Sequence, residues 1–133
     1  MQPISDELDI LSRELIGEAI SRLEADGALP VLLAVDCEDE FFAFEDDTPD
    51  GCYRAACMQV GTLGERCTRY AIAYDGVIQE VETDAGSPAI VIEFAERGME
   101  HAWSGFMLYR RAADGCIEVT DPLPAGAEEL LFQ

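Results

Sequence analysis

The densest set of side chains that could do chemistry lies in one short acidic segment. Asp36, Glu38, Asp39 and Glu40 follow one another closely along the chain, and converging carboxylate oxygens are the ligands that calcium and magnesium prefer. The spacing does not match the EF-hand loop, which also needs a glycine that this segment lacks. A divalent-cation site at these four residues is one hypothesis, and a solvated acidic turn is the alternative.

His101 is the only histidine of the chain, so any mechanism with an imidazole base must use it. It follows Glu100, and a nearby carboxylate favours the charged form of an imidazole, which suits a proton carrier. No Gly-x-Ser-x-Gly elbow supplies a nucleophile for it. The alternative is a surface histidine at the start of a strand.

Five cysteines, at positions 37, 52, 57, 67 and 116, form an odd set without a Cys-x-x-Cys pair. Structural zinc sites take ligands about two to four residues apart. Cys52 and Cys57 are five positions apart, a spacing that does not place two side chains on the same side of a helix. We expect reduced thiols, with Cys52 and Cys57 in a core and Cys37 as the exposed thiol. Reduced thiols, and an N-terminus without the basic and apolar regions of a signal peptide, favour a cytoplasmic protein.

The charge balance narrows the classes of partner. The chain has 28 acidic residues against eight basic ones, a net charge of −20, and all eight basic residues are arginine. Such a chain repels phosphate backbones and anionic membrane surfaces, which argues against nucleic-acid and membrane binding. A P-loop is also absent, because that motif needs a lysine.

The negative charge is unevenly spread along the chain. Residues 1–47 carry 14 acids and two arginines, residues 77–133 carry 11 acids and three arginines, and residues 48–76 are neutral. The surface around Arg54, Arg66 and Arg69 is therefore the least repulsive place for an anionic or protein partner. The alternative is that these arginines only balance neighbouring acids.

Hydrophobic periodicity and turn chemistry predict the elements that position these residues. A helix is expected over 5–26, between Ser5 and Gly27, and a second over 49–63, where Thr48-Pro49-Asp50 is typical of a helix start. The expected strands are 31–35, 41–44, 68–75, 89–95, 101–111 and 116–119. Asp75-Gly76 is expected to form a turn, and a polar connection is expected over 82–88.

This order, α-β-β-α-β-β-β(-β), predicts an α+β fold with two helices packed on one face of a single mixed or antiparallel sheet of about five or six strands. We expect a single domain over 1–120. The acidic and apolar tail over 121–133 contains Pro122, Pro124 and Gly126, and it is expected to form either a short docked helix or a mobile motif.

Four aromatic residues, Tyr70, Tyr74, Trp103 and Tyr109, are expected to form a patch on one sheet face. If the helices cover that face, the patch belongs to the core. If they cover the other face, it is exposed and predicts a binding cleft or a dimer interface.

The leading hypothesis is a small cytoplasmic binding or interaction module without enzymatic activity or cofactor. Its partner would be another protein or a second copy of the chain, and its binding residues would be Trp103, Tyr109, Arg54, Arg66, Arg69 and His101. The first alternative is an acidic decoy that occupies the nucleic-acid site of a basic protein. The second is a metal-dependent or acid-base enzyme that uses His101 or the segment from Asp36 to Glu40.

Overall fold

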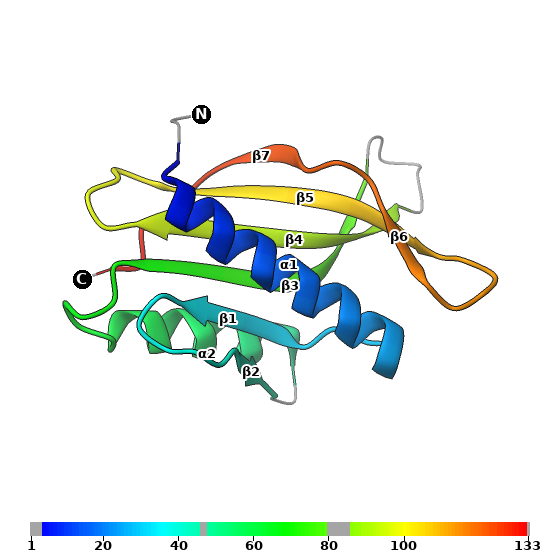
Figure 1. Cartoon of the computed structure of the whole chain (residues 1–133), viewed down its shortest axis with the longest axis horizontal. Coiled ribbons are helices and arrows are strands. Elements are labelled where there is room, and N and C mark those ends of the chain that lie inside the picture. Colours follow the sequence, from blue (N-terminus) through cyan, green and yellow to red (C-terminus); the bar gives the residue numbers. More distant parts are fainter. Residues whose placement is uncertain (1–3, 46–47, 80–85, 133) are drawn as a thin grey trace.

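The computed structural model describes residues 4–45, 48–79 and 86–132 (Figure 1). Its elements are α1 (Asp6–Asp26), β1 (Val31–Val35), β2 (Phe42–Phe44), α2 (Pro49–Gly61), β3 (Arg69–Ile78), β4 (Ser87–Glu96), β5 (Ala102–Arg111), β6 (Ile117–Val119) and β7 (Leu123–Glu128). Both predicted helices are present within two residues of the predicted limits. The predicted connection over 82–88 lies mostly outside the described residues, and Ser87 and Pro88 already belong to β4.

The helix limits follow from local cap chemistry. The Ser5 hydroxyl accepts a hydrogen bond from the backbone N–H of Leu8 at 3.1 Å, and α1 ends at Gly27, whose φ of 74° suits a residue without Cβ. The Thr48 hydroxyl accepts from the N–H of Gly51 at 3.0 Å, and Pro49 occupies the first turn of α2.

The strands form one antiparallel sheet in the order β2-β1-β3-β4-β5-β6, and β7 also pairs with β5. The predicted α+β class is confirmed, with seven strands where about five or six were predicted. The long pairing of β3 with β4 runs from Arg69 opposite Glu96 to Ile78 opposite Ser87. This register places Ile72 opposite Glu93 and Tyr74 opposite Val91 at the centre of the sheet.

The two helices cover opposite faces of the sheet, as Figure 1 shows with α1 in front and α2 behind β1. Leu32 and Ala34 of β1 share a core with α1, whereas the alternate residues of β1 share a core with α2. The prediction that both helices lie on one face is wrong. All five residues of β1 are buried, and a strand buried throughout needs cover on both faces.

The predicted division of β3 at Asp75-Gly76 is also wrong, since β3 continues through both residues to Ile78. Gly76 is not a turn residue here. A Cβ at this position would lie 2.9 Å from a Val91 methyl carbon, so the glycine is explained by close packing of neighbouring strands.

The chain beyond Asp121 is ordered by strand pairing. Leu123–Glu128 forms β7 on the edge of β5, with an irregular register between Ser104 and Gly105. Leu131 donates its backbone N–H to the Tyr70 hydroxyl at 3.2 Å, and the Phe132 ring meets that of Tyr70 edge to face. The segment where a short helix or a mobile motif was expected is therefore a strand followed by apolar residues packed on the α2 face.

Candidate functional site

A buried carboxylate lies on the α2 face of the sheet. Glu93, near the C-terminal end of β4, is only 4% exposed. Each of its two carboxylate oxygens accepts a hydrogen bond from a phenol, Oε1 from Tyr53 at 2.7 Å and Oε2 from Tyr74 at 2.8 Å. We call these three residues the Tyr-Glu-Tyr cluster. No arginine forms an ion pair with Glu93 in the described part of the chain, so neutral donors alone stabilise this charge.

Helix spacing and strand register bring the cluster together. Tyr53 lies in the first turns of α2, next to the buried Cys52, and Tyr74 lies on the same face of β3 as Ile72. Because Ile72 pairs with Glu93 across the β3–β4 ladder, the carboxylate lies diagonally beside the Tyr74 side chain. The two tyrosine rings meet edge to face, with centroids 5.4 Å apart and planes at 75°.

Both phenols of the cluster are held in their neutral form. Burial, followed by the hydrogen bond to Glu93, raises the pKa of Tyr53 and of Tyr74 well above the ordinary value. The phenolic protons thus remain available to donate to Glu93 over the whole physiological pH range. Both rings are thus tied to Glu93 through their hydroxyls.

A cavity of about 620 Å³ opens beside these rings between α2 and the strands β1 and β3. We call it the α2 cavity. Its lining is Leu29, Pro30, Val31, Thr48, Pro49, Asp50, Cys52, Tyr53, Tyr74 and Asp75. The volume falls in the range of about 300–1,000 Å³ typical of small-molecule sites, and the wall combines apolar side chains with a few polar ones.

The charged residues in this lining are both acidic. Asp50 lies in the first turn of α2, and Asp75 in β3 accepts a hydrogen bond from the Tyr109 hydroxyl at 2.9 Å. All eight arginines of the chain are in the described residues, and none of them lines the α2 cavity. The cavity wall is therefore negative without an internal counter-charge.

The structure does not bring the four acids of the predicted metal site to one point. Asp36 accepts the backbone N–H groups of Thr68 at 2.8 Å and of Arg69 at 3.1 Å. Glu38 pairs with Arg66 at 2.6 Å, and Asp39 and Glu40 are exposed. Asp36 thus ties the end of β1 to the start of β3, and its second oxygen faces the Arg69 guanidinium.

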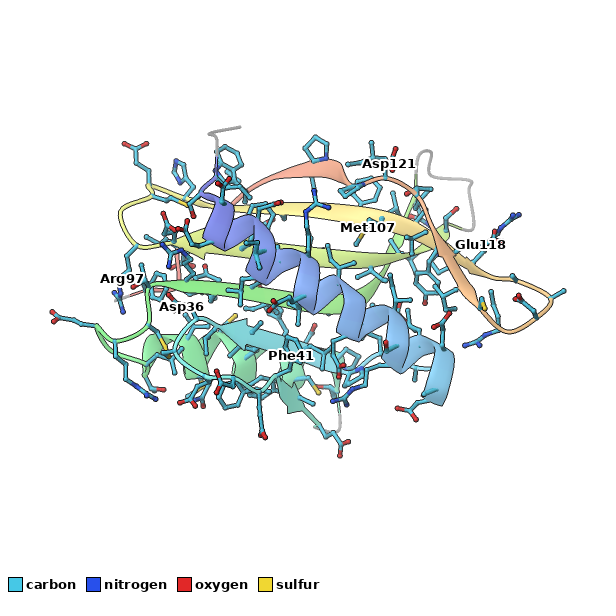
Figure 2. All side chains as sticks on the ribbon, viewed as in Figure 1. Asp36, Phe41, Arg97, Met107, Glu118 and Asp121 are labelled. Atoms are coloured by element: carbon cyan, nitrogen blue, oxygen red, sulfur yellow. A yellow bond between two sulfur atoms is a disulfide. The ribbon has the colours of Figure 1, made fainter. Side chains whose placement is uncertain are left out.

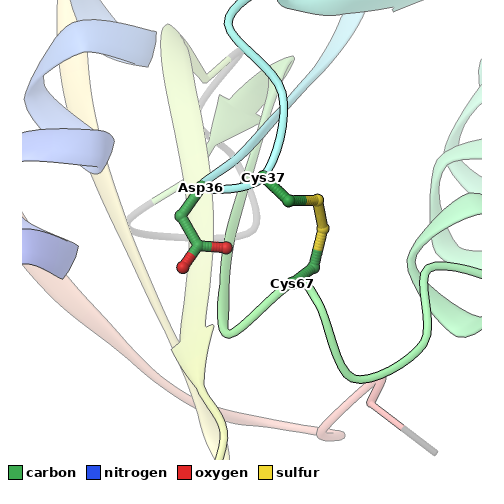
Figure 3. Close-up of side chains that lie close together, drawn as sticks. All are labelled: Asp36, Cys37 and Cys67. Atoms are coloured by element: carbon green, nitrogen blue, oxygen red, sulfur yellow. A yellow bond between two sulfur atoms is a disulfide. The ribbon is translucent and has the colours of Figure 1, made fainter.

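Asp36 does converge with two cysteines, and Figure 3 shows this group of three. Cys37 and Cys67 are joined by a disulfide, with Cα atoms 5.0 Å apart, which occupies both sulfur atoms. The prediction of reduced thiols, with Cys37 as the exposed one, is wrong for this pair. A spacing of 30 residues hid it, because disulfide partners meet in space and not in sequence. Disulfides are typical of oxidising compartments, so the cysteines no longer support the prediction of a cytoplasmic protein.

Two of the three predicted partner-binding arginines are engaged within the protein. Arg66 pairs with Glu38, and Arg69 pairs with Asp36 and Glu96. Arg54 is exposed on α2. Both arginines therefore pair with acids from other segments of the chain.

The predicted aromatic patch is divided between the two faces of the sheet. Phe94 and Tyr109 pack on the α1 face. Trp103 pairs with Phe94 across β4 and β5, so its side chain lies on the same face. Tyr70 and Tyr74 belong to the core on the α2 face. His101 is exposed just before β5, with its ring edge-on to Trp103 at 6.4 Å.

Acidic residues occupy opposite faces and both ends of the molecule. Figure 2 labels Asp36 at one end of the sheet and Glu118 and Asp121 at the other. The acids of α1 and Asp50 of α2 lie on opposite sheet faces. The single array of carboxylates that a nucleic-acid decoy requires is not formed by the described residues, and we do not propose that function.

The Tyr-Glu-Tyr cluster and the α2 cavity were missed from the sequence. One signal was present: Glu93 is the single charged residue within the apolar run 89–95, and a charge inside a buried strand needs a partner. Its partners lie 40 and 19 residues away in the sequence, so no local pattern could identify them.

Comparison of the chain with protein-family models, with curated proteins and with solved structures finds no match. Within the described residues, no helix is long and apolar enough to span a membrane.

Proposed function

We propose that this protein is a binding module that takes a small organic ligand in the α2 cavity. The observation that carries the proposal is a cavity of about 620 Å³ lined by two tyrosine rings. The hydroxyls of both tyrosines donate hydrogen bonds to Glu93. A wall that is ordered in advance loses little conformational entropy when a ligand binds, which favours affinity.

The groups near the cavity favour binding over catalysis. Both oxygens of Glu93 accept hydrogen bonds from the tyrosine hydroxyls. Neither oxygen is therefore oriented toward a substrate proton. Burial raises the pKa of the nearby Cys57 thiol, which disfavours the nucleophilic thiolate. Exposed His101 belongs to the loop before β5 and does not line the cavity.

A fragment screen by protein-observed NMR tests the proposal. A panel of neutral, anionic and cationic fragments is added to the ¹⁵N-labelled protein, and binders are expected to shift the amide signals of the non-proline residues of 29–31, 48–53 and 74–75. Asp50→Trp, which places a large ring at the rim, should abolish these shifts. Glu65→Trp, at an exposed acid outside the lining, is the matched control and should retain them. A panel without any binder at these residues contradicts the proposal.

A homodimer is a second candidate, favoured by exposed apolar side chains on the outermost strands. Val119 of β6 is 39% exposed and Leu123 of β7 is 46% exposed, and both strands pair with β5 at the sheet edge. Light scattering after size exclusion, at several salt concentrations, is expected to show a dimer that Leu123→Glu disrupts. A monomer at every salt concentration removes this candidate.

A further inference from the structure

We infer that the ligand of the α2 cavity is an organic cation, a protonated amine or a quaternary ammonium group. The inference rests on the proposed function and names the chemical class of ligand for that site. Three features of the described residues carry it: the charge of the wall, the geometry of the two tyrosines, and the state of the N–H groups at the start of α2.

The charge of the wall favours a positive ligand. Asp50 lines the cavity from the start of α2, and Asp75 lines it from β3, although the Asp75 carboxylate bonds to Tyr109 on the α1 face. Both phenols that line the cavity donate to the carboxylate of Glu93. The chain has no lysine, and seven of the eight arginines bond to acids or to backbone carbonyls elsewhere: Arg13, Arg22, Arg66, Arg69, Arg97, Arg110 and Arg111. The eighth, Arg54, is exposed and outside the lining. No basic side chain in the described part of this protein therefore offsets the acids of the cavity wall.

The tyrosine pair provides aromatic surface for a cation. Both rings line the cavity and meet edge to face at 75°, and aromatic rings attract ammonium groups to their negative faces. Each hydroxyl donates its proton to the Glu93 carboxylate. Such a hydrogen bond shifts electron density toward the phenol oxygen and its ring, because the carboxylate draws the proton away. The ring faces become more negative, which strengthens their attraction for a cation.

An anionic ligand finds few donors in the same cavity. A helix N-terminus often binds anions, but here two of the N–H groups in the first turn of α2 are already bonded to Thr48. Pro49 has no N–H, the N–H of Gly51 donates to the Thr48 hydroxyl at 3.0 Å, and that of Cys52 donates to the Thr48 carbonyl at 3.1 Å. Asp50 adds a negative charge at the same point. An anion would therefore meet repulsion from Asp50 and find few N–H donors to compensate it.

The test compares matched ligands that differ in charge. Choline, its neutral carbon isostere 3,3-dimethyl-1-butanol, and the anion 3,3-dimethylbutyrate are titrated into the full chain, with binding followed by calorimetry and by the amide shifts of residues 48–53 and 74–75. Choline is expected to bind about tenfold or more tightly than the neutral isostere. Added salt should weaken choline binding and leave the isostere unchanged.

Variants separate the cation site from general surface charge. Asp50→Asn and Tyr53→Leu should each weaken choline binding about threefold to tenfold, while Asp39→Asn, at an exposed acid outside the lining, should leave it unchanged. Equal weakening by Asp39→Asn would assign the effect to net charge and overturn the inference.

The outcomes distinguish the two proposals. If the neutral isostere or the anion binds as tightly as choline, the cation inference fails and the binding proposal stands. If all three ligands fail while only neutral or anionic fragments of the NMR panel bind in the cavity, the cation inference again fails alone. If no fragment binds there, both fail.

Discussion

At the scale of single residues, Glu93 is a costly side chain to bury, at 4% exposed. Removing a carboxylate from water is strongly unfavourable unless each oxygen finds a donor, and here the donors are two neutral phenols. A buried polar group of this kind is either completely satisfied or a liability. The stability of the cluster should therefore depend on its members together.

A mutant cycle tests this dependence. Tyr74→Phe leaves one oxygen of Glu93 without its donor and should lower the free energy of unfolding by about 1–3 kcal/mol. In a Glu93→Leu, Tyr53→Phe background the buried carboxylate is gone. The same Tyr74→Phe change should then lower the free energy of unfolding much less. Urea denaturation measures all variants. Equal costs in both backgrounds would show that the cluster is not coupled.

The tyrosines also set how the protein responds to alkali. Burial is the main cause that raises the pKa of all four tyrosines of the chain, to about 12 for Tyr70 and to about 12 for Tyr109, where a hydrogen bond to Asp75 contributes as well. In the unfolded chain a tyrosine ionises near pH 10. The folded state then holds more protons than the unfolded state above that pH, so stability is unaffected below it and falls as pH rises further.

We therefore expect phenolate absorbance and loss of structure to appear together in an alkaline titration. Ultraviolet absorbance follows the phenolates, and circular dichroism follows the fold in the same samples. Phenolates that form near pH 10 while the circular dichroism stays native would contradict the raised pKa values.

At the scale of elements, two turns at one end of the sheet are joined both covalently and by hydrogen bonds. The Cys37–Cys67 disulfide connects the turn after β1 to the segment before β3. Asp36 accepts N–H groups of that segment, and Arg97 donates to the carbonyls of Cys67 and Gly64. The fold near the disulfide is thus also held by contacts that do not need it.

Loss of this disulfide should weaken the protein without abolishing its fold. A closed loop of 30 residues corresponds to about 3–4 kcal/mol of stability on the chain-entropy estimate. The double variant Cys37→Ser, Cys67→Ser should show this loss in urea denaturation, whereas Cys116→Ser, at an exposed free cysteine, should not. Thiol titration of the unreduced, denatured protein should find three free thiols, and a count of five would contradict the pairing.

The elements that the sequence predicted well are those with local signals. The caps at Ser5, Gly27 and Thr48 placed both helices, and alternation placed the strands. Asp75-Gly76 failed as a turn because the glycine allows close packing against Val91, a contact between distant residues. The continuous apolar run of β1 already indicated cover on both faces, yet both helices were predicted on one.

The candidate site was harder to predict because it is made entirely by register and packing. Tyr53 reaches Glu93 only because α2 crosses β1 and β3 on one face. Cys37 meets Cys67 only because β1 pairs with β3. Two of the charged residues that the sequence did highlight, Asp36 and Arg69, form internal contacts that hold the turns.

At the scale of the whole molecule, the net charge of −20 opposes the compact state through self-repulsion. The ion pairs on the surface offset little of it, because each exposed pair contributes at most about 1 kcal/mol. Raising the ionic strength from about 0.01 M to about 0.15 M shortens the screening length from roughly 30 Å to roughly 8 Å. Screening by salt weakens both the repulsion among the excess acids and the attraction within the surface ion pairs. We expect the weakening of the repulsion to be the larger effect.

We expect the melting temperature to rise by a few degrees over this range of ionic strength, since about 1 kcal/mol corresponds to a few degrees in a domain of this size. Differential scanning calorimetry in sodium and in potassium chloride measures it, and equal effects of the two salts are expected for general screening. A melting temperature that falls with salt would show that the ion pairs outweigh the repulsion.

The disulfide has a mechanical consequence as well. The loop between Cys37 and Cys67 encloses all of β2 and α2, so a force applied at the two ends of the chain cannot extend this part while the bond is intact. An oxidised molecule pulled to full extension should be shorter than a reduced one by about 100 Å, the contour length of the enclosed residues. Under tension, the helix that forms one wall of the α2 cavity would lie outside the path of the force.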